Sequence, residues 1–105
     1  ALRDRIRQYV QQNLRDPALS VDAIARGLNC SRRHLYNAFA GEGETIAGYI
    51  QRLRLQACIR DLQQQGPHAR PITDIAMSWG FGNPSHFSRV FRGHTGKSPS
   101  EFRGS

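Results

Sequence analysis

The sequence has little of what marks several large classes of protein. No hydrophobic run approaches the roughly 20 residues that a membrane-spanning helix needs. Its 2 cysteines cannot build a disulfide framework, which fits a reducing cytoplasm. Only 8 acidic residues are present, and none stands in a pattern that would hold a metal ion or assist a catalytic base. We therefore expect no enzymatic activity, no metal or other cofactor, and no membrane partner.

The chain has the size of one small globular domain, or of two very small ones that share a core. It is 38% hydrophobic and 22% charged, which is typical of a folded rather than a disordered protein. The first residue is Ala1 rather than Met, a helical pattern begins at once, and nothing there resembles a signal peptide. We therefore expect a fragment of a longer cytoplasmic protein.

Arginine, in contrast, is abundant. All of the 15 basic residues except Lys97 are arginine, and the net charge is +7. The guanidinium group matches phosphate groups and guanine edges, so this composition favours a polyanionic partner. A soluble basic protein without such a partner could carry the same charge, so charge alone leaves both interpretations open.

Hydrophobic residues recur at helical spacing nearly throughout, and no segment alternates in the way that predicts a strand. We predict seven helices, of which the first ends at Asp16 and Pro17. The predicted N-terminal caps are Ser20, Ser31, Asn83 followed by Pro84, and the pair Ser98 and Glu101. A connector with a break at Gly66 and Pro67 is predicted before the fifth helix.

The fourth and longest helix is predicted over about residues 45–65, and its apolar residues fall on two faces. One face carries Ile46, Ile50, Leu53 and Ala57, mainly in the early part, and the opposite face carries Leu55, Cys58, Ile59 and Leu62. This pattern predicts one helix that packs against two separate bodies. A helix buried all round in a single core is the alternative.

The two halves of the chain resemble each other. Four apolar residues of the first half recur in order roughly 50 residues later: Ile24, Ala25, Leu35 and Phe39 match Ile75, Ala76, Phe87 and Phe91. Each half reads as a short helix, a turn and a longer capped helix, which is the pattern of a helix-turn-helix. We therefore predict helix-turn-helix subdomains at residues 1–44 and 66–105, joined by a linker helix at residues 45–65.

In a helix-turn-helix the second helix enters the major groove of DNA, so its outward face must form hydrogen bonds. The outward residues are Arg32, Arg33, Tyr36 and Asn37 in the first half, and Ser85, Ser88, Arg89 and Arg92 in the second. Arginine can donate two hydrogen bonds to guanine, and asparagine can pair with adenine. A solvated helix face would be equally polar, and a helical adaptor that binds protein through Tyr36 is the competing hypothesis.

The length of the linker helix suits two neighbouring grooves. About 20 residues at 1.5 Å each span roughly 30 Å, and one turn of B-DNA measures about 34 Å. A single chain could therefore place both helices in successive major grooves. Because the two outward faces differ, we expect an asymmetric DNA site, and a rigid linker would require the DNA to bend slightly.

The second half resembles the AraC/XylS family of transcriptional regulators, since residues 72–103 read ITDIAMSWGFGNPSHFSRVFRGHTGKSPSEFR. The first half agrees at Ile24, Ala25, Ser31, Leu35, Phe39, Tyr49 and Ile50, so the resemblance covers nearly the whole chain. It implies an all-α, homeodomain-like domain of about seven helices. It also implies bacterial transcription regulation, usually activation, with promoter DNA and RNA polymerase as partners and a location at the nucleoid. An effector ligand or a dimer partner would bind only through an N-terminal domain that this chain lacks.

The family pattern places base contacts at Arg33, Tyr36, Asn37, Pro84, Ser85 and Arg89. We expect phosphate contacts from Ser31, Arg32, His34, Asn83, His86, Ser88 and Arg92. The chain departs from the family at residues 43–46, at Gly82 and at His86, and Pro84 can offer only an apolar contact, as to a thymine methyl.

Several other residues have a structural interpretation. Cys30 and His34 share a helix spacing, but zinc needs about four ligands and no second pair lies nearby. We expect both His34 and His86 to be semi-buried, either packed in a core or donating to phosphate. Arg54 is interpreted as a structural ion-pair partner rather than a DNA reader.

Overall fold

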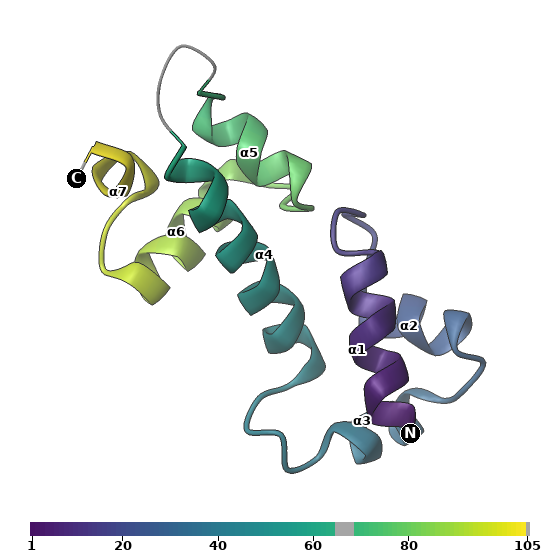
Figure 1. Ribbon diagram of the computed structural model, residues 1–105. Coiled ribbons are helices and arrows are strands. Elements are labelled where there is room, and N and C mark those ends of the chain that lie inside the picture. The colour runs from purple at the N-terminus through teal and green to yellow at the C-terminus, as the bar shows by residue number, and fades with distance from the viewer. Residues whose placement is uncertain (65–68, 105) are drawn as a thin grey trace.

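The computed structural model describes residues 1–64 and 69–104, and folds these segments into seven helices with no strand (Figure 1). The helices are α1 (Leu2–Gln12), α2 (Val21–Gly27), α3 (Arg32–Phe39), α4 (Ile46–Leu62), α5 (Ile72–Ser78), α6 (Pro84–Thr95) and α7 (Pro99–Gly104). The predicted all-α fold is confirmed. The break predicted at Gly66 and Pro67 lies outside the described residues. None of the helices in the described segments combines the length and apolar character needed to cross a bilayer.

The molecule is elongated, with principal extents of 45 × 24 × 22 Å, and contains two hydrophobic clusters. The first cluster consists of Ile6, Val10, Leu19, Ile24, Ala25, Leu35, Phe39, Ile46, Tyr49 and Ile50. The second cluster consists of Leu55, Cys58, Leu62, Ile75, Ala76, Phe81, Phe87 and Phe91. The helices α1–α3 surround the first cluster, α5–α7 surround the second, and α4 runs from one to the other (Figure 1).

The prediction that α4 packs against two bodies is confirmed. Ile46 and Ile50 are buried in the first cluster, and Leu53 packs against it. Two residues after Leu53 the contacts have changed, since Leu55 is buried in the second cluster. Ala57, which the helical pattern placed with the first face, is fully buried but belongs to neither cluster.

Two helices are shorter than the sequence pattern indicated. The first helix ends at Gln12 rather than at Asp16, because the Asn13 side-chain amide donates to the Tyr9 carbonyl at 2.8 Å and closes the last turn. The long helix ends at Leu62 rather than near residue 65. There the Gln64 N–H bonds to the Asp61 carbonyl, three residues back, which is a tightened turn typical of a helix end.

The predicted helix caps are confirmed. The side chains of Ser20, Ser31 and Asn83 each accept a hydrogen bond from the backbone N–H three residues further on, and Thr45 does the same for α4. Before α7, Ser98 and Glu101 bond to each other's backbone N–H groups at 3.0 and 3.2 Å, as in a capping box. These caps fix where each helix begins, and therefore which side chains its outer face carries.

The cap of α3 gives a direct test. Replacing Ser31 by alanine should lower the free energy of unfolding by about 1 kcal/mol, because the His34 N–H loses its acceptor at 3.1 Å. Urea denaturation followed by far-ultraviolet circular dichroism measures the change. The control Ser88→Ala removes an exposed hydroxyl from inside α6 and should cost nothing, since alanine is the better helix former. Equal losses in both variants would contradict the role of Ser31 as a cap.

Candidate nucleic-acid interface

The first helix-turn-helix consists of α2, a turn and α3. The turn passes through Asn29, whose φ of 54° lies in the left-handed region that asparagine tolerates. Leu35 and Phe39 anchor the inner face of α3 in the first cluster. With this face fixed inward, Arg33, Tyr36 and Asn37 are exposed on the outer face, and Tyr36 is 47% exposed.

The second unit, α5, a turn and α6, is anchored by aromatic side chains. Phe87 lies 5.0 Å from Phe81 and 5.7 Å from Phe91 between ring centroids, and Phe91 lies 5.4 Å from Phe102 of α7. This row of rings holds the inner face of α6 in the second cluster. The outer face of α6 is polar in consequence, and its residue Arg89 is exposed.

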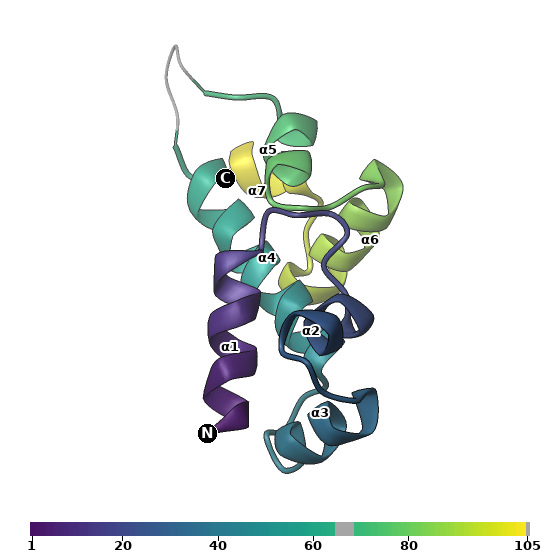
Figure 2. The same cartoon turned by 90° about the vertical axis from the view of Figure 1, so that its right-hand side faces the viewer.

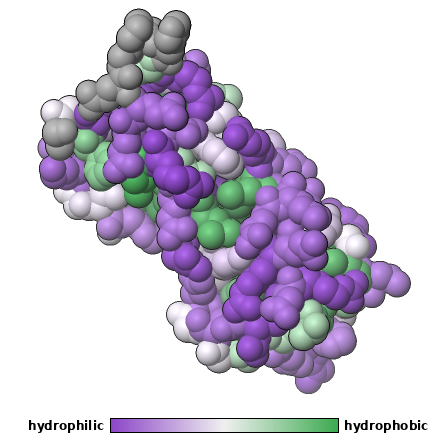
Figure 3. Space-filling model, in the orientation of Figure 1, coloured by the Kyte–Doolittle hydropathy of each residue, from purple (hydrophilic) through white to green (hydrophobic). Residues whose placement is uncertain are grey.

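The two second helices lie on one side of the molecule. Figure 2 shows α3 and α6 at different heights on the same long side, with α1 on the opposite side. The face that carries α1 and α4 is largely hydrophilic, with an apolar area at the waist between the two halves (Figure 3). Two helices with exposed polar residues that lie along one side of the molecule are the arrangement needed to contact one extended partner.

The structure exposes every residue that the sequence predicted to contact DNA. On or next to α3 these are Ser31, Arg32, Arg33, His34, Tyr36 and Asn37, and on or next to α6 they are Asn83, Pro84, Ser85, His86, Ser88, Arg89 and Arg92. Each set is brought together on its own helix, and the two sets lie on different halves of the chain. The predicted semi-burial of both histidines is wrong, because His34 and His86 each lie in the first turn of a helix and are exposed.

Some of these side chains already have partners within the chain. Arg32 lies 3.2 Å from the Asp22 carboxylate and donates to the Tyr36 hydroxyl at 3.3 Å. The hydrogen bond to Tyr36 and the charge of Asp22 both raise the pKa of Arg32. Arg32 therefore holds the Tyr36 ring in place beside Arg33 while remaining exposed itself.

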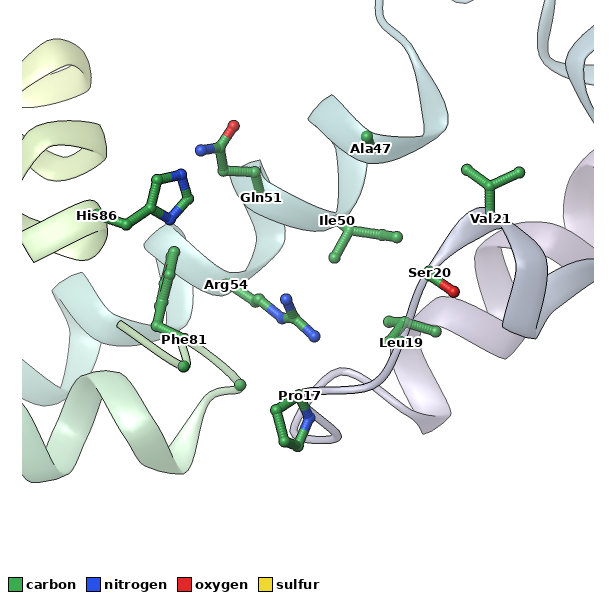
Figure 4. Close-up of a pocket in the computed structure, with 12 residues that line it drawn as sticks. Pro17, Leu19, Ser20, Val21, Ala47, Ile50, Gln51, Arg54, Phe81 and His86 are labelled. Carbon is green, nitrogen blue, oxygen red and sulfur yellow. The ribbon is translucent and has the colours of Figure 1, made fainter. Parts of the chain in front are cut away.

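A cleft of about 510 Å³ separates the two halves (Figure 4). Ser20 lines it from the first half, Gln51 from α4, and His86 from the start of α6. Sequence patterns did not identify Ser20 or Gln51 as neighbours of the α6 residues, because the three meet only through the tertiary packing of the two halves.

Arg54 also lines this cleft, and the contact ion pair predicted for it is replaced by hydrogen bonds to backbone carbonyls. Its guanidinium donates to the carbonyls of Leu14 at 3.0 Å and Asp16 at 2.7 Å. Among residues 1–64 and 69–104 it forms no ion pair at contact distance, although the charge of Asp16 still acts on it. Burial lowers the pKa of Arg54, although an arginine remains charged at any physiological pH. The structural role expected for this residue holds, but it is a hydrogen-bonding role. Within residues 1–64 and 69–104, no three potential metal ligands gather into a site.

Comparison with known proteins agrees with this geometry. A family model described as a helix-turn-helix domain matches residues 24–105. The chain is 32% identical to the transcriptional activator NphR of a Rhodococcus species over 99 residues, which are 94% of this chain and 29% of NphR. It is 30% identical to the probable transcription factor PqrA of Proteus vulgaris over 101 residues, covering 95% of this chain and 80% of PqrA.

A solved structure shows the same architecture. It is that of a transcriptional regulator from Chromobacterium violaceum, described by its AraC-type DNA-binding domain, with 31% identity and a TM-score of 0.79 over 94% of this chain and 86% of that one. Fold and polar faces together define a double helix-turn-helix domain. The chain belongs to the AraC/XylS family of transcriptional regulators.

Proposed function

We propose that this chain binds double-stranded DNA sequence-specifically, with α3 and α6 in successive major grooves of one asymmetric promoter site. The observation that carries the proposal is that α3 and α6, whose polar residues are exposed, lie on the same long side of the molecule (Figure 2). Support for a regulatory role comes from the membership of the chain in a family of transcriptional regulators. Because α3 and α6 carry different side chains, the two half-sites should differ in sequence.

The chemistry of the exposed side chains separates candidate base contacts from candidate phosphate contacts. Arg33 and Arg89 can each donate two hydrogen bonds to guanine, and Asn37 can pair with adenine. Tyr36 and Ser85 can donate to base edges, and Pro84 can contact a thymine methyl.

The remaining residues of the two faces are phosphate contacts in this proposal. Ser31 and Asn83 accept hydrogen bonds as helix caps, and each still has a donor group to offer to a phosphate oxygen. Arg32, His34, His86, Ser88 and Arg92 are exposed around the base-reading positions.

The wider setting is also a proposal. Residues 1–44 and 66–105 would act as two DNA-reading subdomains, joined through the helix within residues 45–65. By analogy with NphR, a transcriptional activator, the protein would activate transcription through contact with RNA polymerase, in the cytoplasm at the nucleoid. An effector or a dimer partner would act through a further domain, since the chain spans 29% of NphR.

Selection of bound sequences from a pool of random DNA tests this function. We expect one recurrent motif with two unlike half-sites whose centres lie about one helical turn apart. A palindromic motif, or a motif with a single half-site, would contradict the two-groove arrangement. Absence of any enriched DNA, together with binding of a protein partner that survives high salt, would indicate a helical adaptor instead.

The two candidate base-reading arginines give a sharper test. Arg33→Ala and Arg89→Ala should each weaken binding to the selected site by about 1–3 kcal/mol and relax the preference at one base pair. Each substitution should act on a different half-site, because Arg33 lies on α3 and Arg89 on α6. Fluorescence anisotropy with single-base variants of the site measures both effects.

A matched control is Arg60→Ala, which removes the same charge from an exposed position on α4. This substitution should leave base preference unchanged. If Arg33→Ala or Arg89→Ala weakens binding equally on every sequence, the residue is a phosphate contact.

A further inference from the structure

We propose that Arg15 is a positioning residue that sets the separation of α3 and α6, and thereby the spacing of half-sites that the protein accepts. This inference rests on the proposed DNA-binding function and deepens it. Arg15 lies in the segment after α1, far in sequence from every residue assigned to DNA contact. It is fixed by contacts with the second half of the chain.

The contacts of Arg15 join the two halves directly. Its guanidinium carbon lies 3.7 Å from the centroid of the Trp79 ring, close enough for the two planes to stack. The same guanidinium donates to the Ser78 carbonyl at 3.1 Å. That carbonyl belongs to the last turn of α5, where the helix dipole favours a cation. One side chain therefore holds the end of α5 against the segment that follows α1. Figure 1 shows these two segments next to each other.

The Trp79 ring, on which Arg15 stacks, is itself held in place. The Trp79 indole N–H donates to the Asp61 carboxylate at 2.7 Å, and Arg70 donates to the same oxygen at 2.9 Å. Asp61 lies on α4, so the ring on which Arg15 rests is bound to the linker helix. Because the Trp79 ring is held in place, its contact with Arg15 fixes the segment after α1 relative to α5. A ring that could rotate freely would not do so.

A second arginine contacts the same two segments. Arg54 on α4 bonds to the Leu14 and Asp16 carbonyls on either side of Arg15, and its side chain points toward that segment in Figure 4. It also lies against the turn after Trp79, because a Cβ atom added to Gly80 would come within 2.7 Å of the guanidinium. Gly80 has a φ of +99°, a left-handed backbone conformation that favours glycine.

These contacts matter because little else joins the halves. The two hydrophobic clusters share no residue, and among the described residues none of α1–α3 packs extensively against α5–α7. Without the arginine contacts, α4 alone would set the angle and distance between the two DNA-reading helices. If α4 were the only connection, the two halves could change their relative orientation as α4 bends and twists. The arginine contacts form a second connection beside α4, and this fixes the relative orientation of the halves.

The test measures how the affinity for DNA depends on the spacing between the half-sites. A residue that only stabilised the fold would not change this dependence. Inserting two base pairs between the half-sites rotates one by about 70° relative to the other. The wild-type protein should lose at least about tenfold in affinity for this DNA, since the protein or the duplex must deform to reach both half-sites. Arg15→Ala should reduce that penalty to less than about threefold, because a loosened domain adapts to the altered spacing.

The control variant and the control DNA isolate this effect. Arg60→Ala removes the same charge from an exposed position of α4 and should keep the wild-type penalty. On DNA that contains either half-site alone, Arg15→Ala should bind as the wild-type protein does. If Arg15→Ala keeps the wild-type penalty for the longer spacer, the positioning role is wrong, although DNA binding stands.

A measurement without DNA separates this inference from the proposed function. Spin labels attached through Arg26→Cys on α2 and His94→Cys on α6 report the distance between the halves, with Cys30→Ser as background. The buried Cys58 should remain unlabelled, since burial raises the pKa of its thiol to about 12. We expect a narrow distance distribution that broadens when Arg15→Ala is added. An unchanged distribution would overturn the role of Arg15, whether or not the protein binds DNA.

Discussion

Replacing Phe91 by alanine should lower the free energy of unfolding by about 3–5 kcal/mol. The Phe91 side chain is fully buried and lies in the middle of the aromatic row, 5.7 Å from Phe87 and 5.4 Å from Phe102 between ring centroids. Its removal leaves a cavity that rigid neighbouring rings cannot fill, so the transfer and cavity costs add. Since small domains have a net stability of about 5–15 kcal/mol, the loss is a large share of the total.

Urea denaturation monitored by tryptophan fluorescence measures this loss of stability in the half of the chain that contains Phe91. Trp79 is the single tryptophan of the chain and packs against the second cluster, so its emission reports the half that contains Phe91. The control Met77→Ala truncates a side chain that is 57% exposed and should change the stability by less than about 0.5 kcal/mol. A loss below about 1 kcal/mol in Phe91→Ala would contradict the tight packing of the second cluster.

DNA affinity should fall about 10³–10⁴-fold when the salt concentration rises from about 50 to 200 mM. The reason is that each phosphate contact releases a counterion on binding, and six to eight such contacts give a log–log slope of about −5 to −7. The exposed arginines and helix caps of the two halves supply contacts of this kind. A titration of the selected DNA site by fluorescence anisotropy at four or five salt concentrations measures the slope.

Two variants show whether the slope comes from the proposed face. Arg92→Ala should make the slope shallower by about one and weaken binding on all sequences alike, as loss of a phosphate contact does. Ser88→Ala removes a neutral contact from the same helix, so it should leave the slope unchanged. A wild-type slope shallower than about −2 would be inconsistent with a domain that reads two grooves.

Much of the fold could be predicted because local patterns and tertiary packing agree. Helical spacing placed Leu35 and Phe87 at equivalent inward positions, and both are buried. Short polar residues that can cap a helix identified the starts of α2, α3 and α6. The two faces of α4 were visible for the same reason, since opposite stripes on one helix cannot be buried against a single neighbour.

The polar part of the site was predictable only as a set of candidates. Once Leu35 and Phe39 fix which face of α3 is inward, the outward positions follow from geometry, and the structure exposes them. The same geometry does not give the depth of His34 or His86, because exposure near a helix start depends on how the neighbouring turn folds. Both were predicted to be semi-buried, and both are exposed.

The contacts between the halves gave no signal in the sequence. Arg15 follows the first helix in a polar stretch, where one more arginine looks like an ordinary solvated residue. Its stacking on Trp79 joins positions that are far apart in the chain, and no periodicity relates them. Arg54 was assigned a carboxylate partner, but backbone carbonyls of the segment after α1 fill that role. Such partners depend on the three-dimensional course of the main chain.

The change of contacts along α4 has a practical consequence for hybrid regulators. Leu53 still packs against the first cluster and Leu55 is already buried in the second, so Arg54 marks a seam between two complete cores. A chimera that joined the front of this chain to the rear of a homologue at that seam would inherit each core whole from one parent. Moving the crossover by a helical turn in either direction would mix core side chains that were never shaped to fit one another.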